Sequence, residues 1–355
     1  MTTLQTATTN PWSASTRPTG AYSSSWAGRA SAAALCCILL LAGCAPASRD
    51  HRAVFAVFGT EVEVQLRDTV PARAQAAYAD VGTLLQRLHR ELHPWEEGEL
   101  TALNRSIAAG GTHTTTLDLA ALIEASQRLE TATEGAFNPA IGALVELWGF
   151  HTSNYPITDP PPAADPIDAL VAHSPSTRDL VLEELEVRSA NSAVQLDFSG
   201  IAKGLAVRRV CEVIDRHSVG AAMVNAGGDV MVCSAGRRPW RVAVRAPGGG
   251  VLETIEVDRP LAVFTSGNYY RYGDFDGERY AHILDPSTGR PVSEIVQATV
   301  IDSNPMTADA GATALVVAGA DEWERVADLL DAETAIVIDA DGAVSRLDKR
   351  RAGRR

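Results

Sequence analysis

The sequence lacks the features that mark several large classes of protein. Its 355 residues include only five cysteines and 6% aromatic residues, which excludes a disulfide-rich scaffold. No uncharged apolar run reaches the roughly 20 residues that a membrane-spanning helix needs, so a protein with several membrane spans is also excluded. With 46% hydrophobic and 21% charged residues, the composition is typical of a folded globular protein.

Basic charge is also scarce. Lys and Arg number 31 against 44 Asp and Glu, which gives a formal net charge of -13. Because nonspecific binding to nucleic acid requires clustered Lys and Arg, we expect no nucleic-acid partner. The one basic cluster closes the chain, and we interpret residues 346–355 as a solvated, disordered tail. Lys203 is the only lysine within the body of the chain.

Several widespread catalytic motifs are missing. The sequence has no G-x-G-x-x-G, no P-loop, no G-x-S-x-G and no C-x-x-C. The segment His89-Arg90-Glu91-Leu92-His93 places two histidines one helical turn apart, but the zinc-protease pattern needs Glu directly after the first His. We therefore interpret this segment as the polar face of a helix and not as a metal site.

The N-terminal region is typical of an exported bacterial lipoprotein. Residues 30–43 form an uncharged apolar run that is too short to span a membrane and fits the core of a signal peptide. The segment Leu41-Ala42-Gly43-Cys44 looks like a lipobox, in which the chain is cleaved before a cysteine that is then acylated. We expect residues 1–43 to be a signal peptide with a long n-region. Cys44 would then carry the lipid that anchors the protein to the periplasmic face of the inner or outer membrane. The alternative is a buried helix with an incidental cysteine.

Two cysteines remain in the exported part of the chain besides Cys44. Export permits a disulfide between Cys211 and Cys233, since the compartment is oxidising. Their spacing alone does not establish the bond, and two small core residues are the alternative.

The pattern of apolar residues predicts an α+β fold. Strands adjacent in sequence and helices occur in irregular order, which differs from a regular βαβ array. The predicted strands are a hairpin over 53–66, then 179–188, 193–198, short strands up to residue 301, and 334–339. The predicted helices are 71–93, 117–134, one beginning at Pro139, 201–217, 307–318 and 321–331, and residues 151–168 are predicted to form a surface loop.

Two segments of the chain offer contacts for phosphate. In Asp197–Gly204, an acidic residue precedes a turn of small residues that opens a helix. Free backbone N–H groups at a helix start attract phosphate, and Lys203 adds a cation on the first turn. Asn225–Asp229 is a glycine turn between apolar strands, which by itself indicates only a turn.

Two later segments offer a base and metal ligands. In Tyr280–Pro291, His282 precedes a tight turn. In Asn304–Thr313, Asp309 and Thr313 are four residues apart on a predicted helix, so their oxygens project from one face. Hard oxygen ligands of this kind suit Mg²⁺. Each feature alone has a structural explanation, but together they supply a metal site, a phosphate cradle, a cation and a base, which fits phosphoryl chemistry on a nucleotide.

These segments, in this order, resemble the ApbE-type FAD:protein FMN transferases. The likeness covers nearly all of the chain after Cys44, with Phe58 where the family has Met and Asn138 where it usually has Asp. The matching segments are Phe58-Gly59-Thr60, Trp95 with Glu99-Leu100 and Asn104, Gly135–Pro139, Leu147–Phe150, Asp197–Gly204, Asn225–Asp229, Ser266–Tyr269, His282–Pro291 and Asp309–Thr313.

The resemblance implies an enzyme and its site residues. The family fold has two lobes with mixed or antiparallel sheets flanked by helices, here expected over residues 44–345. Such an enzyme splits FAD, attaches FMN through a phosphoester to a Thr or Ser of an acceptor flavoprotein, such as a subunit of a membrane redox pump, and releases AMP. Mg²⁺ would be held by Asp309, Thr313 and a main-chain oxygen near Gly200, with His282 as the candidate base. The positions expected to hold FAD are Phe58, Trp95, Ala136, Phe137, Asn138, Asp197, Lys203 and Ile283.

Two other functions fit parts of this pattern. An FAD pyrophosphatase would use the same site, with water in place of the acceptor hydroxyl. A non-catalytic flavin-binding lipoprotein would have no need for Asp309, Thr313 and His282 together. Release of AMP separates an enzyme from a carrier, and covalent flavin on an acceptor separates a transferase from a hydrolase.

Overall fold

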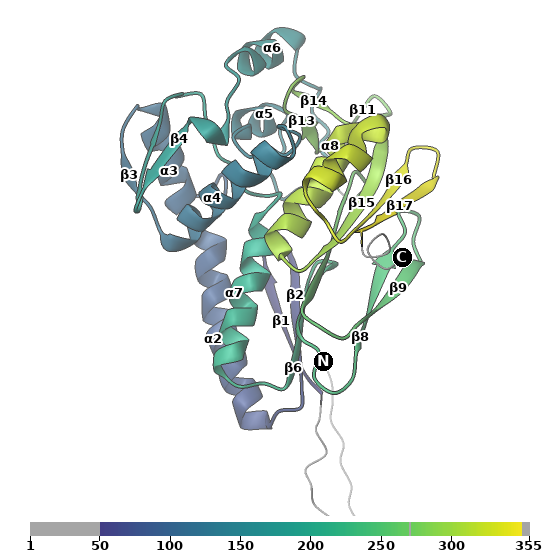
Figure 1. The fold of residues 1–355 in the computed structure, drawn as a ribbon. Helices are drawn as coiled ribbons and strands as arrows, with labels where there is room; N and C mark the ends of the chain where they lie inside the picture. Colours follow the sequence, from purple (N-terminus) through teal and green to yellow (C-terminus); the bar gives the residue numbers. More distant parts are fainter. Residues whose placement is uncertain (1–49, 270, 350–355) are drawn as a thin grey trace, which may run out of the picture. The chain divides into compact units, whose positions relative to one another are not determined.

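An antiparallel sheet of eight strands is the main element of the fold in the computed structural model, which describes residues 50–269 and 271–349 (Figure 1). All neighbouring strands in this sheet run antiparallel, in agreement with the expected α+β class. In spatial order the strands are β1 (His51–Val57), β2 (Thr60–Arg67), β6 (Ala221–Ala226), β7 (Asp229–Ser234), β10 (Leu261–Gly267), β15 (Ile295–Asp302), β16 (Thr334–Asp339) and β17 (Val344–Asp348).

Alternating side chains along the strands build a core on each face of this sheet. In β10, Ala262 and Phe264 belong to the core on the helical face, whereas Leu261 and Val263 belong to the core on the other face. The helices of the first face pack against one another, and a hairpin covers the second (Figure 1). The helices are α2 (Pro71–Glu91), α7 (Ala202–Arg216) and α8 (Pro305–Leu329), and the hairpin strands are β8 (Trp240–Arg245) and β9 (Val251–Val257).

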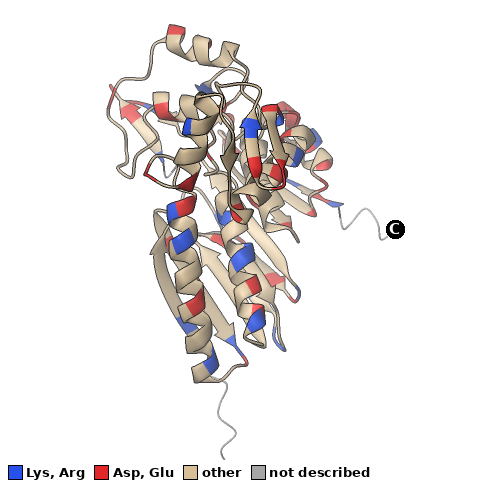
Figure 2. Ribbon diagram, turned by 90° about the vertical axis from the view of Figure 1, so that its left-hand side faces the viewer, with Lys and Arg blue, Asp and Glu red and all other residues tan. Residues whose placement is uncertain are grey.

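Charged residues of both signs alternate along the helices that face the viewer in Figure 2. Arg87 pairs with Glu91 on α2 at 2.7 Å, and Arg208 pairs with Glu212 on α7 at 3.2 Å. Such pairs, four residues apart, contribute only about 0.3–0.5 kcal/mol each. The helices are therefore held on the sheet mainly by their buried apolar faces.

A smaller part of the fold lies between α2 and α7 in sequence. Buried residues of α3, α4 and β5 belong to the same core as the main sheet, so the two parts share one core. Its elements are α3 (Glu99–Ala108), β3 (His113–Thr114), α4 (Leu117–Ala132), α5 (Gly142–Leu147), α6 (Ala164–Ala172), a 3-10 turn (Thr177–Asp179), β4 (Leu180–Glu183) and β5 (Glu186–Ser189). Two hairpins later in the chain join β11 (Tyr272–Phe275) to β12 (Glu278–Ala281) and β13 (Leu284–Asp285) to β14 (Arg290–Pro291).

Most predicted elements occur where the sequence places them. The apolar run at 53–66 is the β1–β2 hairpin. Phe58 and Gly59 close it with positive φ angles of 55° and 67°, as the two-residue type I′ turn requires. Helices α2, α4 and α7 and strand β16 also match their predicted segments with small shifts at the ends.

Other boundaries differ from the prediction. The loop expected over residues 151–168 ends early, because α6 begins within it. The helix expected to begin at Pro139 begins at Gly142 instead. The reason is local: the Asn138 side chain accepts a hydrogen bond from the N–H of Ala140 at 2.9 Å and holds a turn before the helix.

One further segment was assigned the wrong structure. Residues 193–198 do not form a strand, and within them Gln195 makes an isolated bridge to Ile141. The two helices expected over 307–318 and 321–331 are confirmed as the two parts of α8, which Gly319 separates with a non-helical φ of 72°. Helix α3 has no counterpart among the predicted elements, because it is short and follows a polar segment.

Ordered structure extends beyond the domain boundary expected at residue 345. Strand β17 pairs with β16 as far as Asp348, and Lys349 donates to a carboxylate oxygen of Asp331 at 3.0 Å. Residues 350–355 and 1–49, including Cys44, lie outside the described residues. Among the helices of the described part, none is both long and apolar enough to cross a membrane.

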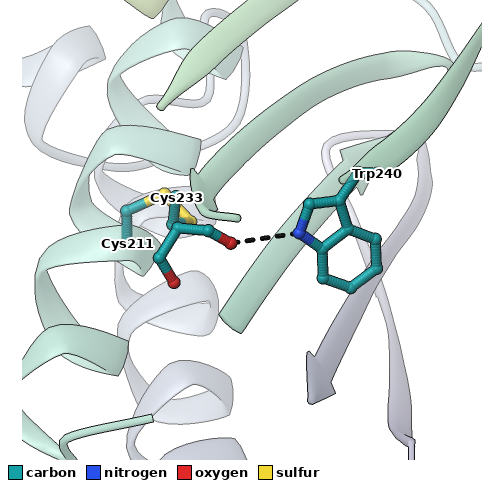
Figure 3. The surroundings of a disulfide bond; sticks show 4 residues. Cys211, Cys233 and Trp240 are labelled. Carbon is teal, nitrogen blue, oxygen red and sulfur yellow. Dashed lines mark hydrogen bonds between the residues drawn. A yellow bond between two sulfur atoms is a disulfide. The ribbon is translucent and has the colours of Figure 1, made fainter. Parts of the chain in front are cut away.

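The cysteine pairing that the sequence left open is present. Cys211 of α7 and Cys233 of β7 form a disulfide, with their Cα atoms 5.3 Å apart (Figure 3). Next to it, the indole N–H of Trp240 donates to the carbonyl oxygen of Ser234 at 3.0 Å. The bond therefore ties α7 directly to the sheet.

Candidate functional site

The first turn of α7 lies directly against the start of α8. Gly204 permits this approach, since a Cβ there would lie 2.6 Å from the carbonyl oxygen of Pro305 and 2.9 Å from the nitrogen of Met306. The backbone N–H of Gly204 donates to Oδ2 of Asp309 at 2.8 Å. A carboxylate of α8 thus satisfies one of the N–H groups that the N-terminus of α7 leaves free.

Three charged side chains meet beside this junction. Lys203 donates to the carboxylate of Asp229, whose other oxygen accepts the N–H of Thr265 at 2.8 Å. Burial opposes the charge of Lys203, but Asp229 and Asp309 outweigh this effect and raise the pKa of the ammonium. Burial raises the pKa of Asp309, which is 3% exposed, to about 7, although Lys203 acts in the opposite direction. A further cation beside Asp309 would stabilise its carboxylate.

Thr313 lies one helical turn after Asp309 and faces the segment that precedes α7. Its Oγ1 is 3.0 Å from Oγ of Ser266 on β10, and a Cβ on Gly200 would lie 3.4 Å from that Oγ1. Of the ligands that the family resemblance implies, the structure therefore places Thr313 beside Gly200, and Asp309 one turn earlier on the same helix against the start of α7. In the described part of the chain, no group of three or more His, Cys, Asp or Glu could hold a metal. The donors here are hard oxygens, a set that suits Mg²⁺ because this ion retains several waters.

His282 lies between β12 and β13, and its imidazole has one nitrogen engaged. Nδ1 is 3.0 Å from the carbonyl oxygen of Arg271, which can only accept, so Nδ1 carries the proton and Nε2 presents a lone pair. Burial, and next the charge of Arg271, lower the pKa of His282 to about 4. Lys203 and Asp197 also act on this imidazole, which links it electrostatically to the cluster at α7. A neutral histidine with a free Nε2 is suited to accept a proton.

A row of aromatic rings runs from the β1–β2 turn to the loop after α5. Successive ring centroids are 5.7, 5.5, 4.5 and 5.3 Å apart. The rings belong to Phe58, His89, His93, Trp95 and His151. The two histidines of the His89–His93 segment thus belong to this row. Trp95 is 38% exposed and stacks on His151 with an interplanar angle of 24°.

Asp197 ends this row through a hydrogen bond with His151. Its Oδ2 is 3.1 Å from Nε2 of His151, and its Oδ1 accepts the N–H of Ser199 at 2.8 Å. Burial alone would raise the pKa of Asp197, but the hydrogen bonds from His151 and Ser199 outweigh it and lower the pKa. Asp197 therefore connects the ring of Trp95, through His151, to the turn before α7.

The other expected flavin contacts differ in accessibility. Phe137 and Ile283 are buried in the main core, and Ala136 is half-buried beside it. The side chain of Asn138 is engaged within the chain: its Nδ2 donates to the carbonyl oxygen of Pro175 at 2.8 Å, and its Oδ1 accepts a backbone N–H. Asn138 therefore fixes the turn before α5, a use of the residue that the sequence did not reveal.

Two residues of the site were missed by sequence reasoning. His151 contacts Asp197 and Trp95, and Arg271 provides the carbonyl oxygen that holds His282. Each lies just beyond a segment that carried the family resemblance, His151 one residue after Phe150 and Arg271 two residues after Tyr269. Their positions next to these segments were the available signal, but contacts between distant segments decide their roles.

Comparison with known proteins gives consistent matches to this fold. The sequence model of the ApbE family matches residues 58–338. The FAD:protein FMN transferase of Rhodobacter capsulatus is 39% identical over 330 residues, covering 90% of this chain and 62% of that protein. The FAD:protein FMN transferase of Vibrio cholerae is 30% identical over 315 residues, covering 87% and 93%. The crystal structure of the ApbE protein of Thermotoga maritima has a TM-score of 0.77 at 27% identity, covering 86% and 100%.

The sheet with the helices that cover it therefore defines the class of fold to which the Thermotoga ApbE structure belongs. The family match covers most of the described residues. The chain belongs to the ApbE family. It spans less than two thirds of the length of the Rhodobacter relative, and nearly all of the Vibrio relative.

Proposed function

We propose that the protein is an FAD:protein FMN transferase, the activity for which its relatives are named. One observation carries the proposal: the side-chain oxygens of Asp309 and Thr313 lie against the start of α7. Lys203 is on the first turn of this helix, and its charge acts on His282. Metal ligands, a cation and a base thus belong to one site. The reaction of the named relatives requires these three functions.

Mg²⁺ is the metal that fits the donors of this site. Asp309, Thr313 and a main-chain oxygen near Gly200 would hold it, and the buried carboxylate of Asp309 would gain a counter-charge. When bound, the ion neutralises charge on the pyrophosphate of FAD. The chain itself supplies a further contact to the phosphates, the ammonium of Lys203, whereas the N–H groups of Ala202, Lys203 and Gly204 at the start of α7 are already bonded within the chain.

The transfer step is a displacement at phosphorus. The hydroxyl oxygen of the acceptor Thr or Ser forms a bond to the phosphorus of the FMN half. The bond from this phosphorus to the bridging oxygen breaks, and AMP leaves with that oxygen and the electron pair. Nε2 of His282 accepts the hydroxyl proton, because a neutral hydroxyl is a poor nucleophile. Lys203 faces the negative charge that develops on the phosphates.

The aromatic row gives the flavin ring a place to bind. Trp95 is the exposed ring of the row, and His151 and Asp197 support it from behind. Stacking of the isoalloxazine on Trp95 would direct the phosphates toward Asp197 and the start of α7. In this arrangement the isoalloxazine of FAD contacts aromatic rings, and the phosphates of FAD lie near charged side chains.

The proposal also places the protein at a membrane. Cys44 would be the lipidated N-terminus after removal of residues 1–43, on the periplasmic side of a bacterial membrane. The disulfide between Cys211 and Cys233 supports an oxidising compartment. Cys44→Ala is expected to leave the protein unprocessed or soluble, and palmitate labelling that is unchanged in this variant would contradict the assignment.

The activity is tested by following both products at once. Protein, FAD and Mg²⁺ are incubated with and without an acceptor flavoprotein, and AMP and in-gel flavin fluorescence of the denatured acceptor are measured. A transferase gives AMP and covalent flavin in equal amounts, and only with the acceptor. AMP and free FMN without acceptor would indicate an FAD pyrophosphatase. Binding of FAD without AMP would indicate a flavin carrier.

A further inference from the structure

Arg271 extends toward the site without a carboxylate partner. Its side chain is exposed, and among the residues that the structure describes it has no ion pair. A Cβ on Gly59 would lie 3.7 Å from its Nη2, and its guanidinium carbon is 5.9 Å from the ring centroid of Tyr155. The guanidinium therefore lies between the β1–β2 turn and the loop after α5.

The backbone of the same residue holds the proposed base. The carbonyl oxygen of Arg271 accepts from Nδ1 of His282 at 3.0 Å. The charge of Arg271 also acts on both His282 and Lys203. One residue thus holds the imidazole with its backbone and places a permanent cation close enough to act on both His282 and Lys203.

Two other cations of the protein each have an acidic partner, which Arg271 lacks among the described residues. Lys203 is compensated by Asp229. Arg279, on the same hairpin as Arg271, also lies over a tyrosine ring, at 4.3 Å from the centroid of Tyr272, but it pairs with Asp274 at 3.6 Å. Among the described residues Arg271 has no ion pair with an acid, so its charge, close to that of Lys203, favours a bound anion.

We propose that Arg271 is a further catalytic residue, whose guanidinium binds the phosphoryl group of the FMN half of FAD. The proposal rests on the proposed transferase function. The planar guanidinium presents parallel N–H donors that match two phosphate oxygens, which a lysine cannot do. As the acceptor oxygen bonds to phosphorus and the bridging oxygen leaves with AMP, Arg271 stabilises the negative charge on the non-bridging oxygens.

The first test is a binding measurement that does not depend on turnover. FMN and riboflavin share the flavin ring and differ in the phosphate, so the ratio of their dissociation constants reports the phosphate contact. Quenching of flavin fluorescence is titrated with wild type, Arg271→Gln, Arg271→Lys and the control Arg279→Gln. Wild type and the control are expected to prefer FMN, and Arg271→Gln is expected to reduce this preference about tenfold or more.

The second test measures transfer under saturating FAD. Arg271→Gln is expected to lower kcat by about 10² to 10³, the usual loss for one donor to a developing oxyanion. Arg271→Lys is expected to recover part of the loss, and Arg279→Gln to keep the wild-type rate. Equal thermal midpoints for the four proteins would show that folding is not the cause.

Each outcome decides the proposal. An unchanged FMN preference in Arg271→Gln, or a wild type that binds riboflavin as well as FMN, overturns the phosphate contact. Full activity of Arg271→Gln overturns the catalytic role. A protein whose FMN preference depends on Arg271, but which forms neither AMP nor covalent flavin, would retain the contact and refute the transferase function instead.

Discussion

The two sides of the site are built in different ways. The inner side consists of α7, α8, β7 and β10, and its functional side chains are Lys203, Asp229, Asp309 and Thr313, each bonded to another part of this core. The outer side consists of hairpins and loops, and its functional side chains are Trp95, His151, Arg271 and His282. Asp229 and Asp309 are 3% exposed, whereas Trp95 is 38% exposed.

This difference matches the demands of the proposed reaction. Metal and pyrophosphate contacts must be held in place before the substrate arrives, because reorganising charged groups during the reaction is costly. The outer side has to admit an acceptor protein and release AMP, and two of its groups, Trp95 and Arg271, are exposed to solvent. The comparison predicts that variants of Asp309 and Lys203 on the inner side lose binding, whereas loss of the base His282 on the outer side removes chemistry and leaves binding intact.

The largest effect is expected for Asp309→Asn. The amide retains an acceptor for the N–H of Gly204, so the fold should persist while the buried charge is lost. FAD cleavage is expected to fall to the level seen with EDTA, measured as AMP release over a Mg²⁺ titration. Thr313→Val, which removes a neutral oxygen, should be milder. Wild-type Mg²⁺ dependence in Asp309→Asn, or full activity with EDTA, would place the metal elsewhere.

His282→Ala is expected to lower flavin transfer by about 10² to 10⁴, the usual contribution of a general base. The reason is the loss of Nε2, since the Nδ1 contact is made to backbone. In-gel flavin fluorescence of the acceptor over time measures the rate. Transfer at the wild-type rate would mean that His282 has only a structural role.

The pH profile tests the same residue without mutation. A base must be neutral, and the fraction of neutral imidazole falls only when the pH drops below its pKa, which burial lowers to about 4. Arg271 and Lys203 act with burial, and Asp197 acts against it. With saturating Mg²⁺, so that the carboxylate of Asp309 stays ionised, the transfer rate is therefore expected to stay level from neutral pH down to about 5, provided the fold persists. A fall centred near the ordinary value of about 6.5 would show that the imidazole is not in this environment.

Lys203→Met should weaken FAD binding and turnover together, by about ten- to a hundredfold. A charged hydrogen bond of about 1.5–3 kcal/mol is lost in the ground state and in the transition state, and Asp229 is left without its partner. Steady-state kinetics with varied FAD separates the two effects. A change in kcat with an unaltered KM would show that Lys203 acts in the chemical step and not in FAD binding.

The smallest effect on activity is expected from removal of the disulfide. Replacing Cys211 and Cys233 together with Ser should lower the free energy of unfolding by about 2–4 kcal/mol, because the bond restricts the unfolded chain. Transfer at 25 °C should remain at the wild-type rate. Denaturant unfolding and initial rates are measured on the same samples, and loss of activity far below the unfolding midpoint would show that the bond positions the site.

The sequence predicted the inner side better than the outer one. The shared helix face of Asp309 and Thr313 follows from their spacing of four residues. The role of the small residues before Lys203 follows from their position at a helix start, and both signals are local. The hairpin turn at Phe58 and Gly59 likewise depends on residues that are adjacent in the sequence. The class of fold also followed from the order of its elements.

The rest depended on contacts between segments far apart in the chain. His151 meets Asp197 across 46 residues, and no local pattern marks such a pair. The role of Asn138 in fixing a turn depends on the carbonyl of Pro175, 37 residues later. Gly204 closes a segment that the sequence assigns to phosphate contacts, but in the structure it lets α8 approach α7.

The most direct test of this account compares FAD binding to two variants, one from each side of the site. Calorimetric titrations of FAD with Mg²⁺ are made on His282→Ala and Asp309→Asn under identical conditions without acceptor. The account predicts wild-type affinity for His282→Ala and loss of metal-dependent binding for Asp309→Asn. Loss of binding in His282→Ala, or metal-dependent binding at wild-type affinity in Asp309→Asn, would contradict it.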